Sequence, residues 1–235
     1  MARLIQVQVV GTSEPRPLPP CRYRFPDPLQ CDEVGLVATG GDFEPETIIE
    51  AYRHAIFPWP HPDGERLWFS PDPRAIIPVG GLHVSRRLAR TLQSARFRVT
   101  MNAAFDRVIR ACADREEGTW ITPAIVESYG RLHELGWAHS FEVWTGDGAL
   151  GGGLYGVQVG ALFGAESMFH IVTDASKVAM VAMMEQAEQT GIQLIDVQVA
   201  NPHTTSMGAV EIPRAEYVSR LREAIAQPVP FAHHV

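Results

Sequence analysis

The sequence predicts an α+β fold organised around an antiparallel sheet. Three strand-like segments, 140–145, 149–159 and 161–169, follow one another closely, and the turn Gly146-Asp147-Gly148 joins the first two. Helix-like segments precede and follow these strands, which is the order of an α+β protein rather than of a regular βαβ repeat. With 235 residues, 46% of them apolar and 20% charged, the chain is long enough to bury a large core.

Capping residues and glycines mark where the helices should begin and end. Ser85 and Asn102 can each cap the helix that follows, and Thr122-Pro123 combines a cap with proline in the first turn. Glycine is common just after a helix, which is where Gly136 and Gly191 stand. In chain order we expect helices over Pro45–Ile56, after Ser85, after Asn102, from Thr122-Pro123 to Gly136, from Asp174 or Ser176 to Thr190, and over Arg214–Ala226.

Alternating apolar residues predict the strands between these helices. The first forty-odd residues are rich in proline and glycine, and a glycine-rich bulge is expected at residues 151–153. We place a boundary near residues 78–82, which divides the chain into a small N-terminal α+β domain, 1–80, and a larger domain, 81–235. Besides the three central segments, strands are expected over Leu67–Phe69, Ala75–Val79, Arg96–Met101 and Leu194–Val199.

A polar pair interrupts the apolar pattern of the last predicted strand. Ile195 and Val197 share one face, so Asp196 and Gln198 lie together on the other, roughly 6–7 Å apart at normal strand rise. A carboxylate and an amide are costly to bury unless they are paired. The pair is therefore either a functional site or a satisfied buried pair that ties the strand to a helix.

Charge is unevenly distributed along the chain. The net charge of −7 argues against indiscriminate nucleic-acid binding, which requires a positive field. Residues 83–99 nevertheless contain five arginines and no acid, and the chain has a single lysine, Lys177. The basic stretch is either a solvated helix face or a surface for phosphate groups, and in the second case arginine must supply most of the contacts.

Several kinds of site and location are disfavoured. The nine histidines show no HExxH spacing and the three cysteines no metal-like spacing, so no metal is expected, and no GxxxxGK[ST] loop supports nucleotide hydrolysis. An odd number of cysteines fits a reducing compartment better than a disulfide framework. No apolar run is long enough for a membrane span and the first residues lack a signal-peptide core, so we expect a cytoplasmic protein without membrane contact.

A set of motifs in fixed order covers most of the chain from Gly35 onward. They are GLVATGGDFEPE, AYRHAIFPWP, LWFSPDPRAII, HVSRRL, VTMNAAFDRVIRACADREEGTWITP, RLHELGWAHSFEVW, GGLYGVQVGALFGAESMF, DASK, LIDVQ and HTTSMGAVEIPR. On these motifs the chain resembles the leucyl/phenylalanyl-tRNA–protein transferase family. So many motifs in one order make the resemblance specific.

The resemblance implies an aminoacyltransferase with an acetyltransferase-like (GNAT-like) core in domain 81–235. Such an enzyme moves Leu, Phe or sometimes Met from aminoacyl-tRNA to the N-terminal α-amine of proteins that begin with Arg or Lys, and so marks them for degradation. The ester carries the driving force, so no ATP, metal or other cofactor is expected. The implied partners are the acceptor stem and 3′ end of aminoacyl-tRNA and a protein with a basic N-terminal residue, and a monomer is the default.

The resemblance also implies roles for residues at matching motif positions. Asp196 would orient the attacking amine and stabilise its charge, Gln198 would hold that carboxylate or the carbonyl, and Glu166 would sit beside the amine. Whether Asp196 also removes a proton is left open, because an ordinary carboxylate with a pKa of about 4 is a weak base for an ammonium. The terminal adenosine and the aminoacyl end would contact Trp59 and Trp120. The transferred side chain would contact Leu154, Met168 and Met183. The tRNA backbone would contact Arg86, Arg87, Arg90 and Lys177.

The chain departs from the family pattern at three places. Met183 stands where an aromatic residue is common, so the preference among Leu, Phe and Met is open. His170-Ile171 stands where Ser-Arg is usual and Asp174 where Asn is usual, which weakens attraction for phosphate and leaves the acceptor rules open.

Other interpretations of the same residues remain open. The tryptophans and methionines could simply pack in the core, and Lys177 could form a surface ion pair. At the level of function, one alternative is a coenzyme A-dependent N-acyltransferase on the same core, which is disfavoured because no [QR]xxGx[GA] loop precedes a helix. The other alternative is a non-catalytic module that binds tRNA or protein N-termini.

Overall fold

The computed structural model describes residues 5–11, 14–32, 34–61, 63–114 and 119–232. Residues 1–4, part of the stretch assessed for a signal peptide, and residues 115–118, part of the longest motif, lie outside the described residues. The helices are α1 (Pro45–Arg53), α2 (Arg86–Gln93), α3 (Phe105–Ala113), α4 (Pro123–Glu134), α5 (Ala175–Thr190), α6 (Pro202–Ser206) and α7 (Arg214–Ile225). The strands are β1 (Val7–Val9), β2 (Leu36–Thr39), β3 (Phe57–Pro58), β4 (Leu67–Phe69), β5 (Arg74–Ile77), β6 (Phe97–Met101), β7 (Ala138–Thr145), β8 (Leu150–Val159), β9 (Leu162–His170), β10 (Leu194–Gln198) and β11 (Val210–Ile212).

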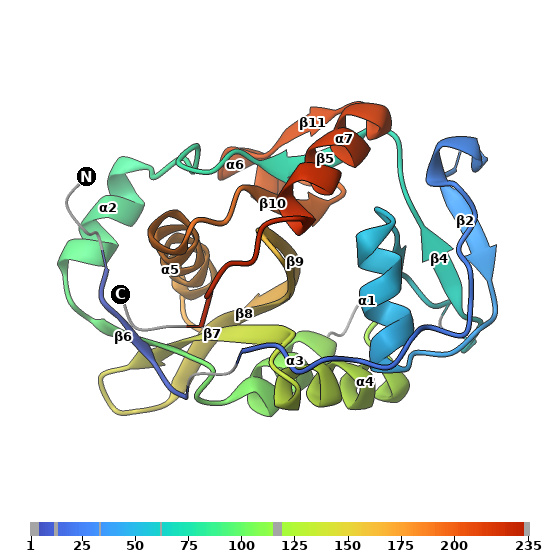
Figure 1. The fold of residues 1–235 in the computed structure, drawn as a ribbon. Helices are drawn as coiled ribbons and strands as arrows, with labels where there is room; N and C mark the ends of the chain where they lie inside the picture. The colour runs from blue at the N-terminus through green and yellow to red at the C-terminus, as the bar shows by residue number, and fades with distance from the viewer. Residues whose placement is uncertain (1–4, 12–13, 33, 62, 115–118, 233–235) are drawn as a thin grey trace.

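Most strands join one mixed sheet in the order β1-β6-β7-β8-β9-β10-β5-β11 (Figure 1). β1 is parallel to β6 and β9 is parallel to β10, whereas the other neighbours are antiparallel. A smaller antiparallel sheet has the order β2-β4-β3, and α1 packs on β3. The predicted mixture of helices with a large, mostly antiparallel sheet is confirmed.

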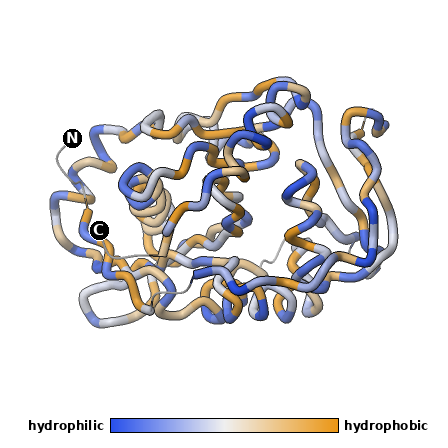
Figure 2. Tube along the Cα trace, in the orientation of Figure 1, coloured by the Kyte–Doolittle hydropathy of each residue, from blue (hydrophilic) through white to orange (hydrophobic). Residues whose placement is uncertain are grey.

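Helices cover both faces of the large sheet. α5 packs on β7 and β8 from one side, while α3 and α4 pack from the other (Figure 1). Figure 2 shows hydrophilic and hydrophobic residues alternating along α3 and α4, as expected for helices that bury one side. Two hydrophobic cores result, one that includes α1, α3, α4 and α7 and one that includes α2 and α5.

Close packing of α5 explains one of the glycines in β8, and a bulge explains another. A Cβ on Gly152 would lie 2.6 Å from the Cβ of Ala175, the first residue of α5, so no larger residue fits without moving the helix. Gly151 is the extra residue where the register between β7 and β8 shifts, so the predicted bulge is confirmed.

Local capping signals locate most of the helix ends. Ser85 and Thr122 each accept a hydrogen bond from the backbone of the helix that they precede, and Gly191 ends α5 with a φ of 91°. The expectation for Asn102 is wrong. This residue has a φ of 65° and its side chain accepts from the Ser140 N–H, and α3 begins three residues later.

Short elements that depend on distant partners are absent from the predictions. These are β1, β2, β3, β11 and α6. β5 lies on the N-terminal side of the predicted boundary near residue 80, yet it pairs with β10 and β11 in the large sheet. The division into domains 1–80 and 81–235 stays a prediction.

None of the helices in the described part of the chain is long and apolar enough to cross a membrane.

Candidate functional site

A pocket of about 840 Å³ opens where β9 and β10 separate. The two strands are paired only from Leu162–Gly164 and Leu194–Asp196, and the residues beyond this pairing, 165–171 and 197–201, line the pocket. The rest of the wall comes from β3 and the residue that follows it, from the end of α3, from Trp120 and Leu154, and from the start of α5 and of α6. Where the parallel pairing of β9 and β10 ends, the backbones and side chains of both strands face the gap between them. This gap forms a cleft in the middle of the sheet.

The structure brings six of the predicted site residues to this pocket. They are Trp59, Trp120, Leu154, Glu166, Met168 and Gln198. Leu154 and Met168 lie opposite one another in the β8–β9 register and give the pocket an apolar side. The Trp59 side chain is 43% exposed and packs its ring against Phe57 and Phe69, so a planar face remains available to a ligand.

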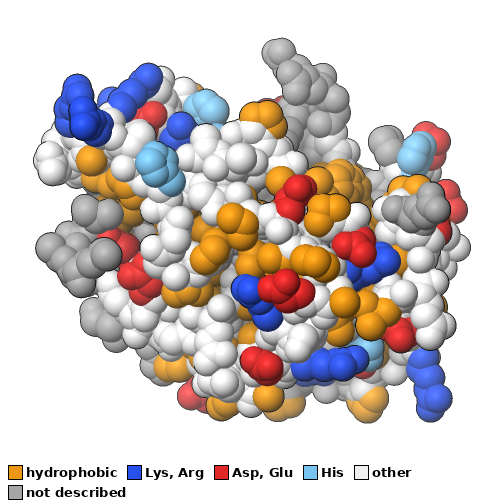
Figure 3. Space-filling model, turned by 90° about the horizontal axis from the view of Figure 1, so that it is seen from above, with side chains coloured by type: hydrophobic (Ala, Val, Ile, Leu, Met, Phe, Trp, Pro, Cys, Tyr) orange, Lys and Arg blue, Asp and Glu red, His pale blue; other side chains and the backbone are white. Residues whose placement is uncertain are grey.

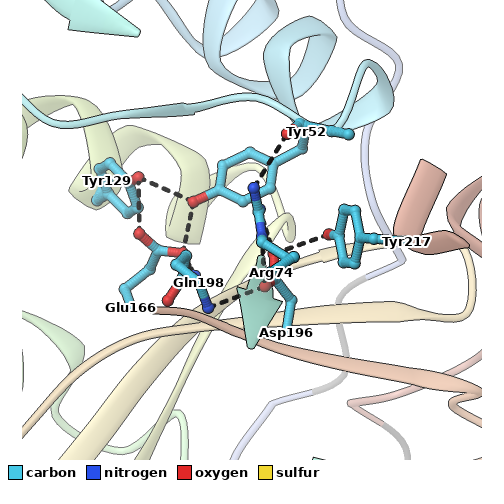
Figure 4. Close-up of polar contacts among 8 residues, drawn as sticks. Tyr52, Arg74, Tyr129, Glu166, Asp196, Gln198 and Tyr217 are labelled. Carbon is cyan, nitrogen blue, oxygen red and sulfur yellow. Dashed lines mark hydrogen bonds and ion pairs between the residues drawn. The ribbon is translucent and has the colours of Figure 1, made fainter. Parts of the chain in front are cut away.

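Glu166, which lines the pocket, is the centre of a hydrogen-bonded cluster (Figure 4). The Tyr52 hydroxyl donates to its Oε1 at 2.5 Å, and the Tyr129 hydroxyl donates to its Oε2 at 3.2 Å. The Gln198 side-chain amide also donates to Oε1, at 3.1 Å, and the two tyrosine hydroxyls lie 3.2 Å apart. The cluster joins α1, α4, β9 and β10 at one carboxyl group.

The surroundings of Glu166 raise its pKa to about 7. Loss of water around the carboxyl group is the main cause, and the negative charge of Asp196 acts in the same direction, whereas hydrogen bonds from Tyr52 and Tyr129 and the charge of Arg74 oppose it. Burial and the Glu166 charge raise the pKa values of both tyrosines well above their usual value, so both remain donors. Near neutral pH the Glu166 carboxyl group can therefore both hold and release a proton.

Asp196 lies behind this cluster and does not line the pocket. Arg74 donates from Nε to Oδ1 at 2.9 Å and from Nη2 to Oδ2 at 2.5 Å, and the side chains are 1% and 0% exposed. The Tyr217 hydroxyl donates to Oδ2 at 2.8 Å, and the backbone N–H of Gln198 donates to Oδ1 at 2.9 Å. Direct contact between Asp196 and an incoming amine, as the resemblance implied, does not fit this placement.

Gln198 reaches the pocket because β10 ends irregularly. The register between β10 and β5 shifts between Asp196 and Gln198, and Gln198 has a φ of 57°, which is unusual for a residue with a side chain. This left-handed residue turns the chain out of the sheet and directs the amide to Glu166. The expectation of a regular strand as far as Val199 is therefore wrong at its end.

Met183 is the second predicted pocket residue that the structure places elsewhere. Its side chain is fully buried on α5 within the core that this helix forms with the sheet, and it is not part of the pocket wall. Contact between Met183 and a transferred side chain does not fit this placement.

The arginines predicted to contact tRNA lie on α2, away from the pocket lining. Arg86, Arg87 and Arg90 are exposed, and Figure 3 shows Lys and Arg side chains gathered at the end of the molecule that carries α2. Asp174 faces this helix instead of capping α5, with its Oδ2 3.6 Å from the Arg87 Nε. Lys177 is half-buried on α5 and is close enough to His203, at the pocket wall, to add to the lowering of the His203 pKa that burial mainly causes.

The charged residues of the pocket wall are acids and histidines. They are Asp114, Glu166, His170 and His203, and no Lys or Arg belongs to the wall among the described residues. Nor do the described residues contain a group of three or more His, Cys, Asp or Glu side chains placed to hold a metal ion. A pocket of this charge suits a cationic or neutral ligand better than a pyrophosphate, which would call for basic side chains.

Sequence reasoning missed two residues of the Glu166 cluster, Tyr52 and Tyr129, and two partners of Asp196, Arg74 and Tyr217. A signal for one of them was present. Arg74 stands beside the apolar run 75–77, and a buried arginine in a strand needs an acidic partner, although the sequence alone does not say which acid this is. The tyrosines carry no comparable signal, because a tyrosine on the apolar side of a helix is usually core.

Comparisons with known proteins show which family the chain is similar to. Residues 76–222 match the model of the family described as leucyl/phenylalanyl-tRNA protein transferase, and residues 41–72 match the model of its N-terminal domain. The leucyl/phenylalanyl-tRNA–protein transferase of Anaeromyxobacter dehalogenans (strain 2CP-C) is 51% identical over 208 residues, which cover 87% of this chain and 89% of the relative. That of Salmonella typhimurium is also 51% identical over 208 residues, with 87% and 88% covered. A solved structure of L-PGS from Bacillus licheniformis aligns with 63% of this chain and 48% of its own at a TM-score of 0.37 and 9% identity, a likeness too weak to add to the description of the fold.

Proposed function

The chain belongs to the leucyl/phenylalanyl-tRNA protein transferase family, and on this premise we propose that it joins Leu or Phe from aminoacyl-tRNA to the N-terminal α-amine of proteins that begin with Arg or Lys. It is an aminoacyltransferase. We include Met as a further donor residue and degradation of the modified protein as the consequence. A cytoplasmic monomer completes the proposal.

The observation that carries the proposal is the position of Glu166 and Gln198 beside an apolar wall. Both side chains line the pocket, where a carboxyl group with a pKa of about 7 and an amide can hold an amine. Leu154 and Met168 form the neighbouring wall that an apolar aminoacyl side chain would contact. One cavity therefore offers surfaces for both reacting groups, which is what acyl transfer by positioning requires.

The tRNA end would enter past the two tryptophans. Trp59 and Trp120 both line the pocket, and stacking of a base on an aromatic ring contributes roughly 1–3 kcal/mol. Arg86, Arg87 and Arg90 on α2 and Lys177 on α5 are proposed to contact the tRNA backbone. These residues lie outside the pocket, as contacts to the acceptor stem would, while the 3′ end occupies the pocket itself.

The acid content of the pocket supports an acceptor with a basic first residue. Asp114 and Glu166 both belong to the wall, and the described part of the wall contains no Lys or Arg. Because opposite charges attract most strongly where water is limited, a guanidinium or ammonium side chain is favoured there over an acidic one.

We also propose that domain 81–235 is acetyltransferase-like and that a smaller domain, 1–80, precedes it. The large sheet with α5 on one face and α3 and α4 on the other supports such a catalytic core. Under this division β5 is a strand that the smaller domain contributes to the sheet of the larger one.

Mass spectrometry of peptide products tests the proposal. The purified chain is incubated with leucyl-, phenylalanyl- or methionyl-tRNA and a peptide that begins with Arg, and an added residue at the peptide N-terminus is expected. The same peptide with an acetylated N-terminus is the control and should stay unmodified. No amide product with any of the three tRNAs would overturn the proposal, and modification by acetyl-coenzyme A alone would favour the N-acyltransferase alternative.

A further inference from the structure

Two strained backbone residues are bonded to the same buried ion pair. Among the described residues other than glycine, only five have a φ in the left-handed region: Ala55, Ala95, Asn102, Asp174 and Gln198. Arg74 donates from Nη1 to the Ala55 carbonyl at 3.1 Å, and Asp196 accepts from the Gln198 N–H at 2.9 Å. A non-glycine residue keeps such a φ only where surrounding contacts stabilise it. Here Arg74 stabilises Ala55 and Asp196 stabilises Gln198, each through a hydrogen bond.

Each of these two residues belongs to or precedes a segment that lines the pocket. Ala55 joins α1 to β3, and the segment 57–59 that follows lines the pocket. The Arg74 guanidinium lies 4.6 Å from the centre of the Phe57 ring and 4.4 Å from that of Tyr217, so it fixes the start of this wall from behind. Gln198 lines the pocket itself and donates from its side-chain amide to Glu166.

The Asp196 carboxylate is fully engaged away from the pocket. Both oxygens accept from Arg74, and Tyr217 and the Gln198 backbone supply further donors (Figure 4). A group that takes a proton from a substrate must come within hydrogen-bond reach of it. Glu166 lines the pocket and Asp196 does not.

We propose that Arg74 and Asp196 are positioning residues that hold Trp59 and Gln198 in place, and that Glu166 receives the proton of the acceptor amine. This inference rests on the proposed aminoacyl transfer. The acceptor binds as an ammonium, which gives one proton to the Glu166 carboxylate. The neutral nitrogen then attacks the ester carbonyl, a C–N bond forms, and the bond between that carbon and the ribose oxygen breaks. Of the two remaining N–H protons, one goes to the ribose oxygen and one stays on the amide.

The charged and titratable groups around Glu166 determine how variants should behave. Tyr52 faces it from α1 and Tyr129 from α4, while Asp196 on β10 and Arg74 on β5 act through their charges. Asp196 raises the pKa of Glu166 and Arg74 lowers it. Removing the Asp196 charge alone must therefore move the titration of Glu166 to lower pH without abolishing it.

The pH dependence of kcat/KM for the peptide distinguishes the two carboxylates. In the wild type we expect activity to fall below about pH 7 as Glu166 becomes protonated. Asp196→Asn should reduce kcat by about 100-fold because Trp59 and Gln198 are no longer held in position. Its kcat/KM should still fall at acid pH (the acid limb of the profile), with the midpoint shifted below pH 7. Glu166→Gln should lose this limb, and its kcat/KM should instead follow the deprotonation of the acceptor amine, whose pKa is about 7.7–8. An Asp196→Asn enzyme without the limb, or a Glu166→Gln enzyme that retains it, would overturn the inference.

A double variant and a control separate positioning from loss of folding. Arg74→Gln/Asp196→Asn leaves no buried charge unpaired, and its limb should stay near pH 7 because two opposing charges are removed together. Glu142→Gln removes another buried carboxylate, which accepts from Thr100 and Ser140 and is not part of the pocket. It should lower the melting temperature and leave the limb in place. A wild type without amide product would overturn the proposed function and this inference with it, whereas an active wild type whose double variant lost the limb would overturn the inference alone.

Discussion

Glu166 is held where an ionised carboxyl group is less stable than in water, and this position has a cost for the fold. Its pKa is about 7 in the folded chain and 4.5 as the ordinary value. Between these two pH values the folded state retains a proton that the unfolded chain has released, so stability falls as pH rises through this window. Below pH 4.5 both states are protonated and the effect vanishes. The carboxyl group that we propose as the proton acceptor therefore destabilises the protein near neutral pH.

Glu166→Gln should accordingly stabilise the protein at high pH. Relative to wild type, we expect a gain of about 1–2 kcal/mol on going from pH 4 to pH 8, which is less than the full pKa shift would give because the side chain partly faces the water of the pocket. Urea unfolding at both pH values measures it. Asp106→Asn, at an exposed ion pair on α3, is the control and should show no such difference. A variant that is destabilised equally at both pH values would contradict the prediction.

At the residue scale, the sequence identifies the polar residues of the site better than it identifies their hydrogen-bond partners. The alternation of polar and apolar residues points to Asp196 and Gln198, and the resemblance points to Glu166. What the sequence does not reveal is that Asp196 faces inward, because this depends on the register that brings Arg74 of β5 beside β10. A pairing between residues 122 positions apart is a property of the folded sheet.

At the scale of elements, predictions succeed where the stabilising contact is local. Ser85, Thr122 and Gly191 act on their own helices, so α2, α4 and α5 are found close to their true ends. β3 and β11 contain only two or three residues and exist because they pair with strands already in place, so no local pattern marks them. Asn102 has the composition of a cap but adopts a left-handed conformation at the end of β6 instead.

Asp174, directly before α5, contacts α2 and should weaken the attraction of the α2 arginines for tRNA. Its Oδ2 accepts from Thr91 at 3.0 Å and lies 3.6 Å from the Arg87 Nε and 3.8 Å from the Arg96 Nη2. Asp174→Asn keeps a side chain that tolerates the φ of 72° but removes the negative charge. If the α2 arginines contact tRNA, KM for aminoacyl-tRNA should fall several-fold and depend more steeply on salt.

Binding of aminoacyl-tRNA at several salt concentrations measures this effect. Asp106→Asn removes an acid of equal charge that pairs with Arg110 on α3, away from α2, and should leave both KM and the salt slope unchanged. Weaker binding of aminoacyl-tRNA by Asp174→Asn would contradict the prediction. It would show that the Asp174 ion pairs position the arginines for tRNA more than they reduce the positive charge of α2.

At the scale of the whole molecule, basic and acidic side chains gather in two different regions of a protein with a net charge of −7. Arginines gather on α2 at one end (Figure 3), while the described wall of the pocket contains Asp114 and Glu166 without Lys or Arg. A polyanion is attracted to the first region and a cationic peptide to the second. The net charge alone would have suggested neither, because it averages over the whole sequence.

This division of charge predicts opposite effects from a double variant of α2 and a single substitution in the pocket. Arg86→Gln/Arg90→Gln should raise KM for aminoacyl-tRNA several-fold and leave KM for an Arg-initiated peptide unchanged, because each lost arginine removes a phosphate contact. Asp114→Asn should do the reverse, and should reduce the preference for a peptide that begins with Arg over one that begins with Gln, since the pocket loses a negative charge. Initial rates with each substrate varied in turn measure both effects. Arg222→Gln, an exposed arginine on α7 outside the pocket lining, is the matched control and should change neither KM. If Asp114→Asn and the α2 variant both altered KM for the same substrate, the two regions would be acting on one ligand, and the separation of tRNA and peptide by charge would have to be abandoned.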